Sequence, residues 1–364
     1  MRLESRDAPL PASAWLADEP GPVSGWVANV DAIAHVVHAG GLRVPVLVDG
    51  PAASSNSYVA GARSAWLDYA LDELIDGRRP ARFAALPLRA TLGGMLRAAG
   101  FHRCAWFDNP LFSTQLPAPG LAGAVPALEA WAAASAPGRL RLWRNVCGAV
   151  DGGLSETLVR QGWQMLPARQ VYLCDPDDSS LWKRNHVRRD QKLMKDPEVS
   201  WVTHEALRES DLPALRRCFR AVFIDKHSAW NPDFTAAFFE RQRLHGPLEF
   251  VALRWNGALV GVLGLYAQAG WLTTPLIGYD TTAPASLGLY RRLMARLLFE
   301  ARERGLRLHY SSGAGEFKRN RGGEPVLEYT AADARGLAPG QRHAFAVVAR
   351  GLRSAAPAIL QRFG

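Results

Sequence analysis

One stretch, residues 271–323, constrains the fold more than any other part of the chain. Residues 272–280 are apolar, include β-branched side chains and end in a polar turn, which predicts a strand. Apolar residues recur every three or four positions over residues 290–301, which predicts a helix that Gly305 ends. Residues 306–310 then alternate as a second strand would. A strand, a helix and a strand in this order predict a parallel crossover and therefore an α/β sheet.

The same stretch resembles a known superfamily. Tyr279-Asp280 is followed by a short loop, by S-L-G-L-Y at residues 286–290 and, after the helix, by HYSSGAGEFKRNRGG. This arrangement is similar to the C-terminal half of GNAT acyltransferases, and more closely to the tandem-GNAT branch that includes Fem-type aminoacyltransferases. The resemblance covers roughly residues 178–330. Ordinary GNAT enzymes carry Q/R-x-x-G-x-G/A before the helix, where this chain has PASLGL at residues 284–289, and this departure favours the Fem-like alternative.

The chain is long enough for two domains of ordinary size, because it has 364 residues. Strands and helices alternate in residues 1–177, which predicts a mixed α/β domain that the resemblance makes GNAT-like. Residues 178–198 read as a Lys/Arg-rich connector helix, and residues 199–364 as a second GNAT-like domain. The predicted fold is therefore α/β, with two GNAT-like mixed α/β domains in tandem joined by a basic helix.

Within the first half, some assignments depend on short patterns. Residues 42–48 read as a strand and residues 82–86 as a second, because both are short apolar runs. Residues 30–39 read as a short helix, and residues 116–126 as a Pro/Gly linker.

The composition indicates which partners the protein binds and where in the cell it is found. The net charge is +9, which indicates either solvated arginines or an anionic partner. We find no long uncharged apolar run and no secretory signal, and the four cysteines are scattered, so we expect a cytoplasmic protein without a membrane span. We find no metal-binding motif, and therefore expect no metal.

Four residues are candidates for the chemistry. Transfer of an acyl group to an amine requires loss of the amine proton, a polarised carbonyl and a place for the leaving group. We expect the strands ending at Tyr279-Asp280 and at Tyr310 to separate and leave a slot for a thioester or ester. Asp280 could orient or deprotonate the amine or simply cap the turn, and Tyr290 could protonate a leaving thiolate or simply pack in the core. Tyr310 ends the second strand, and the resemblance makes Lys318, after G-x-x-x-F, the best positional match.

Further residues are candidates for binding. The resemblance places His227, Trp230, Tyr279 and Glu316 near the acceptor, although a lone histidine is more often structural. Ser286, Gly288 and Arg291 lie at the start of the predicted helix, which is a natural anion site for a cofactor-like donor.

These observations lead to three hypotheses. The first is an N-acyltransferase that moves an acyl group from acyl-CoA or another thioester donor to an amine of a small metabolite by direct attack. The alternative is a Fem-like enzyme that uses aminoacyl-tRNA, and the third is a non-catalytic GNAT-like scaffold. The partners expected are a small-molecule amine and either tRNA or a carrier protein, and no DNA.

Overall fold

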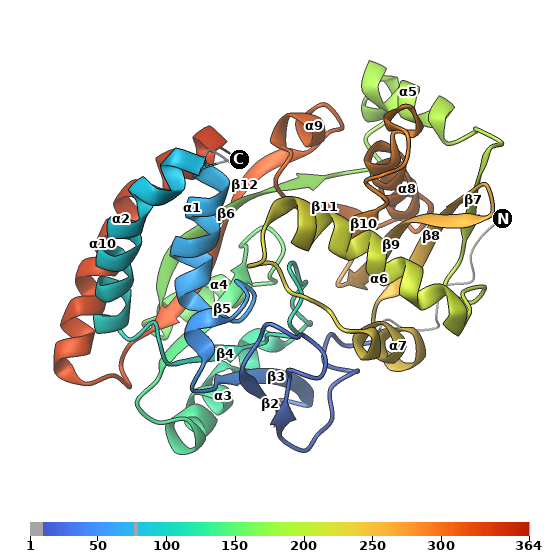
Figure 1. Cartoon of the computed structure of the whole chain (residues 1–364). Helices are drawn as coiled ribbons and strands as arrows, with labels where there is room; N and C mark the ends of the chain where they lie inside the picture. The colour runs from blue at the N-terminus through green and yellow to red at the C-terminus, as the bar shows by residue number, and fades with distance from the viewer. Residues whose placement is uncertain (1–9, 76–78, 364) are drawn as a thin grey trace.

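The computed structural model describes residues 10–75 and 79–363 of the chain (Figure 1). A single mixed sheet of 12 strands runs through this part of the molecule in the order β1-β2-β3-β4-β5-β12-β6-β11-β10-β9-β8-β7. The strands of the first half are β1 (Gly21–Pro22), β2 (Ala32–Ala39), β3 (Leu42–Asp49), β4 (Cys104–Phe107), β5 (Leu140–Val146) and β6 (Gln164–Cys174). Those of the second half are β7 (Val199–Val202), β8 (Glu249–Trp255), β9 (Ala258–Gln268), β10 (Trp271–Tyr279), β11 (Arg307–Ser312) and β12 (Glu324–Asp333).

The two halves share this sheet through an exchanged strand. β12 comes from the C-terminal part of the chain but lies between β5 and β6, antiparallel to both. β6 in turn pairs with β11, so the sheet continues from the first half into the second without a break. The bounds 1–177, 178–198 and 199–364 of the expected domains stay a prediction.

Helices cover both faces of the sheet (Figure 1). They are α1 (Tyr69–Ile75), α2 (Arg79–Ala98), α3 (Leu121–Ser135), α4 (Leu154–Arg160), α5 (Asn185–Leu193), α6 (Leu212–Arg220), α7 (Ala236–His245), α8 (Leu289–Glu303), α9 (Gly315–Arg319) and α10 (Pro339–Phe363). α6 packs on β9 and β10, α8 packs on β9, β10 and β11, and α10 packs on β6 and α2. Among the described residues, no helix is both long enough and apolar enough to cross a membrane.

One hydrophobic core joins the halves. It contains Phe112 and Leu142 from the first half together with Phe219 and Phe250 from the second. Two further cores are local, one beneath α8 and one beneath α3 and α4. The two halves are therefore connected by packing as well as by the exchanged strand.

The predicted crossover is confirmed. β10 pairs parallel with β11, and α8 connects them. Buried side chains such as Leu293 and Leu297 recur on the face of α8 that packs on the sheet. Gly305 adopts φ +64° directly after the helix, and the N–H of Leu306 bonds to the carbonyl of Ala301 at 2.8 Å. These contacts satisfy carbonyl groups at the helix end, as glycine-terminated helices commonly do.

Three local predictions were wrong, and one strand was missed. Residues 30–39 contain strand β2, because its alternating side chains are held by eight residue pairs with β3. Residues 82–86 lie within α2, because a short run of alanine and leucine also suits a helix. α3 begins at Leu121, inside the expected linker. β12 was not foreseen, because its partners β5 and β6 lie far away in the sequence.

Candidate active site

The two strands of the crossover separate part-way along their length. β10 and β11 pair only over Trp271–Thr273 and Arg307–His309. Beyond these residues β10 continues beside β9 and β11 beside β6, and each shows an irregular register where the pairing ends. The gap confirms the expected separation. Backbone groups that face such a gap can bond a ligand instead of a neighbouring strand. A cavity of about 360 Å³ lies instead at the paired end of the strands, beside Gly270 and Arg307.

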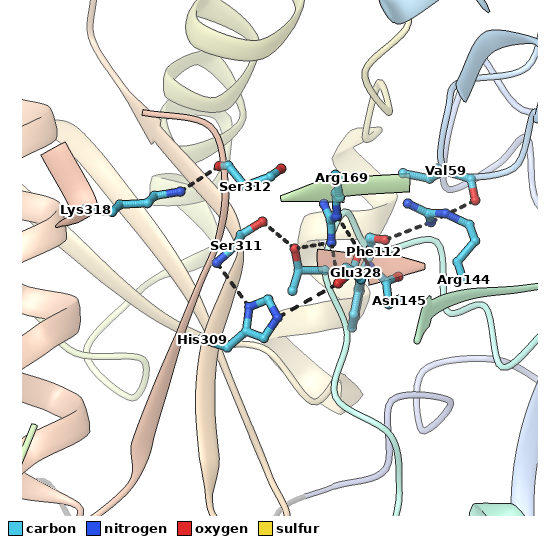
Figure 2. A network of polar contacts seen from close by, with 11 residues as sticks. Val59, Phe112, Arg144, Asn145, Arg169, His309, Ser311, Ser312, Lys318 and Glu328 are labelled. Carbon is cyan, nitrogen blue, oxygen red and sulfur yellow. Dashed lines mark hydrogen bonds and ion pairs between the residues drawn. The ribbon is translucent and has the colours of Figure 1, made fainter. Parts of the chain in front are cut away.

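Lys318 lies in α9, shortly after β11, and its side chain is buried with 3% of the residue exposed. Its Nζ donates to the carbonyl oxygen of Ser312 at 2.6 Å, as Figure 2 shows. The same Nζ lies 5.7 Å from the centroid of the Tyr172 ring. Burial, together with the charge of Arg169, lowers the pKa of Lys318 from 10.5 to about 7. An amine with this pKa can accept and donate a proton near neutral pH.

A buried ion pair lies next to the gap (Figure 2). Arg169 of β6 donates from Nε to Oε1 of Glu328 on β12 at 2.5 Å, and from Nη2 to Oε2 at 3.3 Å. Burial alone would raise the pKa of Glu328, but the charge and hydrogen bonds of Arg169 outweigh it and hold the pKa below its usual value. Glu328 is therefore a fixed negative charge within the sheet.

His309 of β11 faces the same ion pair. Its Nε2 lies 3.9 Å from Oε2 of Glu328, and its Nδ1 accepts the backbone N–H of Ser311 at 3.1 Å. Burial lowers the pKa of His309 to about 4, so the ring is neutral at pH 7. Because Nδ1 accepts a hydrogen bond, the ring proton belongs on Nε2, which points toward Glu328. His309 therefore orients groups at the gap and does not change its charge near neutral pH.

The first half contributes directly to this network. Thr114 accepts a hydrogen bond from Nη2 of Arg169 at 3.0 Å, and its hydroxyl lies 2.5 Å from that of Ser311. Asn145 of β5 donates to Oε1 of Glu328 at 3.0 Å. The polar network beside the gap is thus assembled from strands of both halves.

Two of the predicted residues meet at the mouth of the gap. The rings of Tyr279 and Tyr290 lie 6.3 Å apart, and the ring of Phe317, next to Lys318, lies 5.0 Å from that of Tyr290. Burial, and to a lesser extent Tyr279, raises the pKa of Tyr290 to about 12. Its phenol is therefore protonated at neutral pH and can act as a hydrogen-bond donor.

Tyr310 and Glu316 do not join this cluster. Tyr310 is 1% exposed and belongs to the core beneath α8. Because side chains alternate along a strand, it points to the face opposite His309. Its hydroxyl donates to the carbonyl of Arg321 at 3.3 Å, and burial raises its pKa. Glu316 is exposed on α9.

Asp280 adopts the turn-capping arrangement that was the structural alternative. Its Oδ1 accepts the backbone N–H of Thr282 at 2.8 Å and the hydroxyl of the same residue at 2.7 Å. These bonds fix the turn between β10 and α8. A part for Asp280 in the transfer itself stays a prediction.

His227 and Trp230 lie on the segment that follows α6. His227 is exposed, and its ring lies 6.2 Å from that of Phe223. The carbonyl of Trp230 accepts the N–H of Tyr58 at 2.9 Å and the hydroxyl of Ser57 at 2.8 Å. This segment is therefore held against the first half, and its predicted contact with an acceptor stays a prediction.

Ser286, Gly288 and Arg291 lie together at the start of α8. Ser286 is exposed, and Gly288 adopts φ +56° immediately before the helix. The N–H groups of the first turn of a helix have no partner within it, which makes this end attractive to anions. The side chain of Arg291 bonds to Asp190 of α5 at 2.5 Å, so it links the two helices.

The connector helix α5 carries an exposed basic face. Asp190 anchors it from the inside, because this buried carboxylate also accepts two hydrogen bonds from Arg321, at 2.6 and 3.2 Å. Within the residues that the structure describes, no ion pair to an acidic residue involves the exposed basic side chains Arg184, His186, Arg188, Arg189, Lys192 and Lys195. We call these six residues the α5 basic face; Arg184 directly precedes the helix, and Lys195 follows it.

Sequence reasoning missed much of the polar network, namely Thr114, Asn145, Arg169, His309 and Glu328. A weak signal existed for two of them. Arg169 interrupts a mostly apolar strand, and Glu328 lies in the middle of a segment with apolar flanks. A charged residue inside an apolar strand indicates a buried partner, although it does not identify that partner.

Comparison with known proteins gives a family for part of the chain. A family model described as acetyltransferase (GNAT) domain matches residues 183–319, which include α8, both separated strands and Lys318. No curated protein matches.

The solved structures that are similar to this chain include the following three. The C-terminal domain of a putative lysylphosphatidylglycerol synthetase from Agrobacterium fabrum is 11% identical, with 88% of each chain covered and a TM-score of 0.49. FemX is 9% identical, with 85% of this chain and 88% of that chain covered and a TM-score of 0.49. L-PGS from Bacillus licheniformis is 13% identical, with 68% of this chain and 82% of that chain covered and a TM-score of 0.48. Residues 183–319 therefore match the model of a GNAT acetyltransferase domain.

Proposed function

We propose that this protein is an N-acyltransferase that moves an acyl group from a thioester donor, such as acyl-CoA or a carrier protein, to an amine of a small metabolite. The observation that carries the proposal is the gap between β10 and β11 with the buried amine of Lys318 beside it. The donor carbonyl would lie in this gap, where backbone groups can bond it.

The proposed reaction is a direct attack. The amine nitrogen forms a bond to the acyl carbon, the carbon–sulfur bond breaks, and the amine proton passes to neutral Lys318. Lys318 has a pKa of about 7. A thiol has a pKa of roughly 8.5, so the proton can pass on from Lys318 to the leaving thiolate. Tyr290 would donate a hydrogen bond to that thiolate, because its phenol stays protonated at neutral pH.

The N-terminal end of α8 would position the donor. A pyrophosphate or phosphate of the donor would lie at the N-terminal end of α8, near Ser286 and Gly288. Tyr279 and Phe317 would border the chain that leads from this phosphate to the thioester.

The test is incubation of the purified protein with a panel of acyl-CoAs, acyl-carrier donors and amines. We expect formation of an amide with at least one pair and its loss in Lys318→Met. Absence of turnover with every pair would contradict the thioester proposal.

A second donor is favoured by one specific observation. The α5 basic face lies on and next to the helix that Arg291 joins to the start of α8, so a polyanion bound there would reach the donor end of the gap. Aminoacyl-tRNA would meet this requirement. Its binding should weaken steeply with salt, because each phosphate contact releases counterions. Retention of tRNA at low salt that is lost in Arg188→Gln/Arg189→Gln would support this donor, whereas no retention at low salt would remove it.

A further inference from the structure

A loop of the first half occupies the narrow end of the gap. We call residues 108–117, which follow β4, the β4 loop. Every residue of this loop is buried except Ser113, which is half-buried. Ser113 donates from Oγ to the carbonyl of Pro275 on β10 at 2.7 Å. The next residue, Thr114, contacts Ser311 on β11 through its hydroxyl at 2.5 Å.

These two residues therefore connect both separated strands. The last pair between the strands is Thr273 with His309, and Pro275 and Ser311 each lie two residues beyond it. Ser113 and Thr114 thus lie where the strands begin to diverge, and a chain that extended into this end would meet them first. Ser311 adopts φ +62° at this point, an uncommon conformation for a serine, where the register between β11 and β6 is irregular.

The β4 loop is held firmly from behind. Asn109 donates from Nδ2 to the carbonyl of Val59 at 2.7 Å and accepts the N–H of Leu111 at 2.9 Å. The buried guanidinium of Arg144 donates to the carbonyls of Val59 and of Phe112, at 3.0 and 3.3 Å (Figure 2). Burial, together with the charge of Arg169, lowers the pKa of Arg144 to about 10, which leaves it charged at neutral pH. Movement of a loop that is held by a buried cation and packed core residues would cost free energy, because close packing in the core would be lost.

We infer that Ser113 and Thr114 form the end wall of the donor site, so that the first half sets the length of the acyl chain that the second half transfers. This inference rests on the proposed function, because it concerns the same gap. A short acyl chain fits in front of the wall, whereas a longer one collides with a rigid, buried loop. Because Ser113 is the half-buried member of the pair, its side-chain volume determines the depth of the site.

The experiment measures kcat/KM for straight-chain donors from acetyl-CoA to dodecanoyl-CoA with one amine acceptor. Wild type is compared with Ser113→Gly, which removes volume, and with Ser113→Leu, which adds it. Ser113→Ala is an intermediate variant, because it removes Oγ with its hydrogen bond to Pro275 but keeps Cβ. We expect Ser113→Gly to shift preference toward longer chains and Ser113→Leu toward shorter ones. The ratio of long-chain to short-chain kcat/KM should change by at least about tenfold, since one methylene in a fitted pocket discriminates by that much or more. Ser113→Ala should shift the preference in the same direction as Ser113→Gly, but by less.

The possible outcomes separate the two claims. An unchanged chain-length profile in a folded Ser113→Gly protein that still turns over thioesters overturns the end wall and leaves the proposed function standing. No thioester turnover by wild type overturns the proposed function, and the inference falls with it. If Ser113→Leu does not fold, as judged by circular dichroism, Ser113→Gly decides alone.

Discussion

Single residues in this molecule show how burial changes the behaviour of charged groups. Lys318 is buried without a carboxylate partner among the described residues, and its pKa falls to about 7. Glu328 is buried with Arg169 and keeps its charge. Burial therefore allows Lys318 to exchange a proton near neutral pH. The ion pair with Arg169 keeps Glu328 negatively charged.

The buried amine predicts a pH-dependent cost in stability. The pKa of Lys318 falls from 10.5 in an exposed setting to about 7 in the fold. Folding therefore disfavours the ammonium form, and wild type loses stability as the pH falls from about 10 to about 7. Lys318→Met lacks this cost, so its stability relative to wild type should increase over the same range, by about 1.4 kcal/mol per unit of pKa shift as an upper limit.

Urea unfolding of both proteins at several pH values between 6 and 10 measures this difference. Lys195→Met, which changes an exposed lysine, is the control and should show no such trend. A stability difference for Lys318→Met that does not change with pH would show that the amine titrates in the fold as it does in water.

The buried ion pair between Arg169 and Glu328 predicts a loss of stability when one partner is replaced. Glu328→Gln removes the charge that compensates Arg169 and leaves a buried guanidinium without a carboxylate. Breaking a buried pair from one side costs about 3–5 kcal/mol. Glu324→Gln is the matched control, because Glu324 is exposed on the same strand and should change stability little. Equal free energies of unfolding for the two variants would contradict the account of this network.

At this scale the sequence suggested candidate residues but not the partners that they have in the fold. Lys318, Tyr279 and Tyr290 were candidates from the strand end, helix and loop of residues 271–323, and the rings of the two tyrosines lie 6.3 Å apart, whereas their part in the transfer stays a prediction. Arg169 and Glu328 were not, because they are 159 positions apart and meet only through the exchanged strand. No local pattern encodes a contact of that range.

At the scale of elements, close packing of α6 on β10 positions one side of the gap. Gly278 of β10 lies directly beneath α6. A Cβ at this position would come within 2.5 Å of the backbone of Phe219. The approach of helix and strand thus depends on the absence of a side chain.

Gly278→Ala should therefore displace α6 or destabilise the protein by roughly 1–3 kcal/mol, the usual cost of overpacking. Gly123→Ala in α3 is the control, because a Cβ there meets nothing within 4 Å and alanine favours a helix. Thermal unfolding measures both. An unchanged melting temperature for Gly278→Ala, with wild-type transfer activity, would show that helix and strand can move apart freely.

Helices and strands could be predicted where a periodic pattern of apolar residues extended over several turns. The helix over residues 289–303 repeats its apolar positions for four turns, and the sequence identified it together with both flanking strands. β2 and α2 were misassigned, because short apolar runs suit either state and their partners decide.

At the scale of the whole molecule, the C-terminal part of the chain completes the first half. β12 lies between β5 and β6, and α10 packs on β6 and α2. The core that contains Phe112 and Phe219 also crosses between the halves. The first half should therefore not fold without the last part of the chain.

Removal of residues 324–364 tests this dependence. We expect amide protection in β4 and β5 to be lost, because β5 loses its partner and the sheet is interrupted. Removal of residues 353–364 alone is the control and should leave this protection intact. Hydrogen exchange reports both. Protected β4 and β5 in the longer truncation would show that the first half is an independent domain.

The central claim is that an acyl group is transferred in the gap between β10 and β11 with Lys318 as the proton acceptor. The most direct test is the pH dependence of kcat/KM for wild type and Lys318→Met with one donor and one amine. The pKa of this amine should lie well below the pH range of the assay, so that the amine itself does not titrate. If Lys318 accepts the proton, the wild-type value should rise with pH through about 7, the pKa of Lys318 in the enzyme without substrate. The account also predicts that the variant loses at least about 100-fold in rate and this inflection. A folded Lys318→Met protein with the wild-type rate and the same inflection would contradict it.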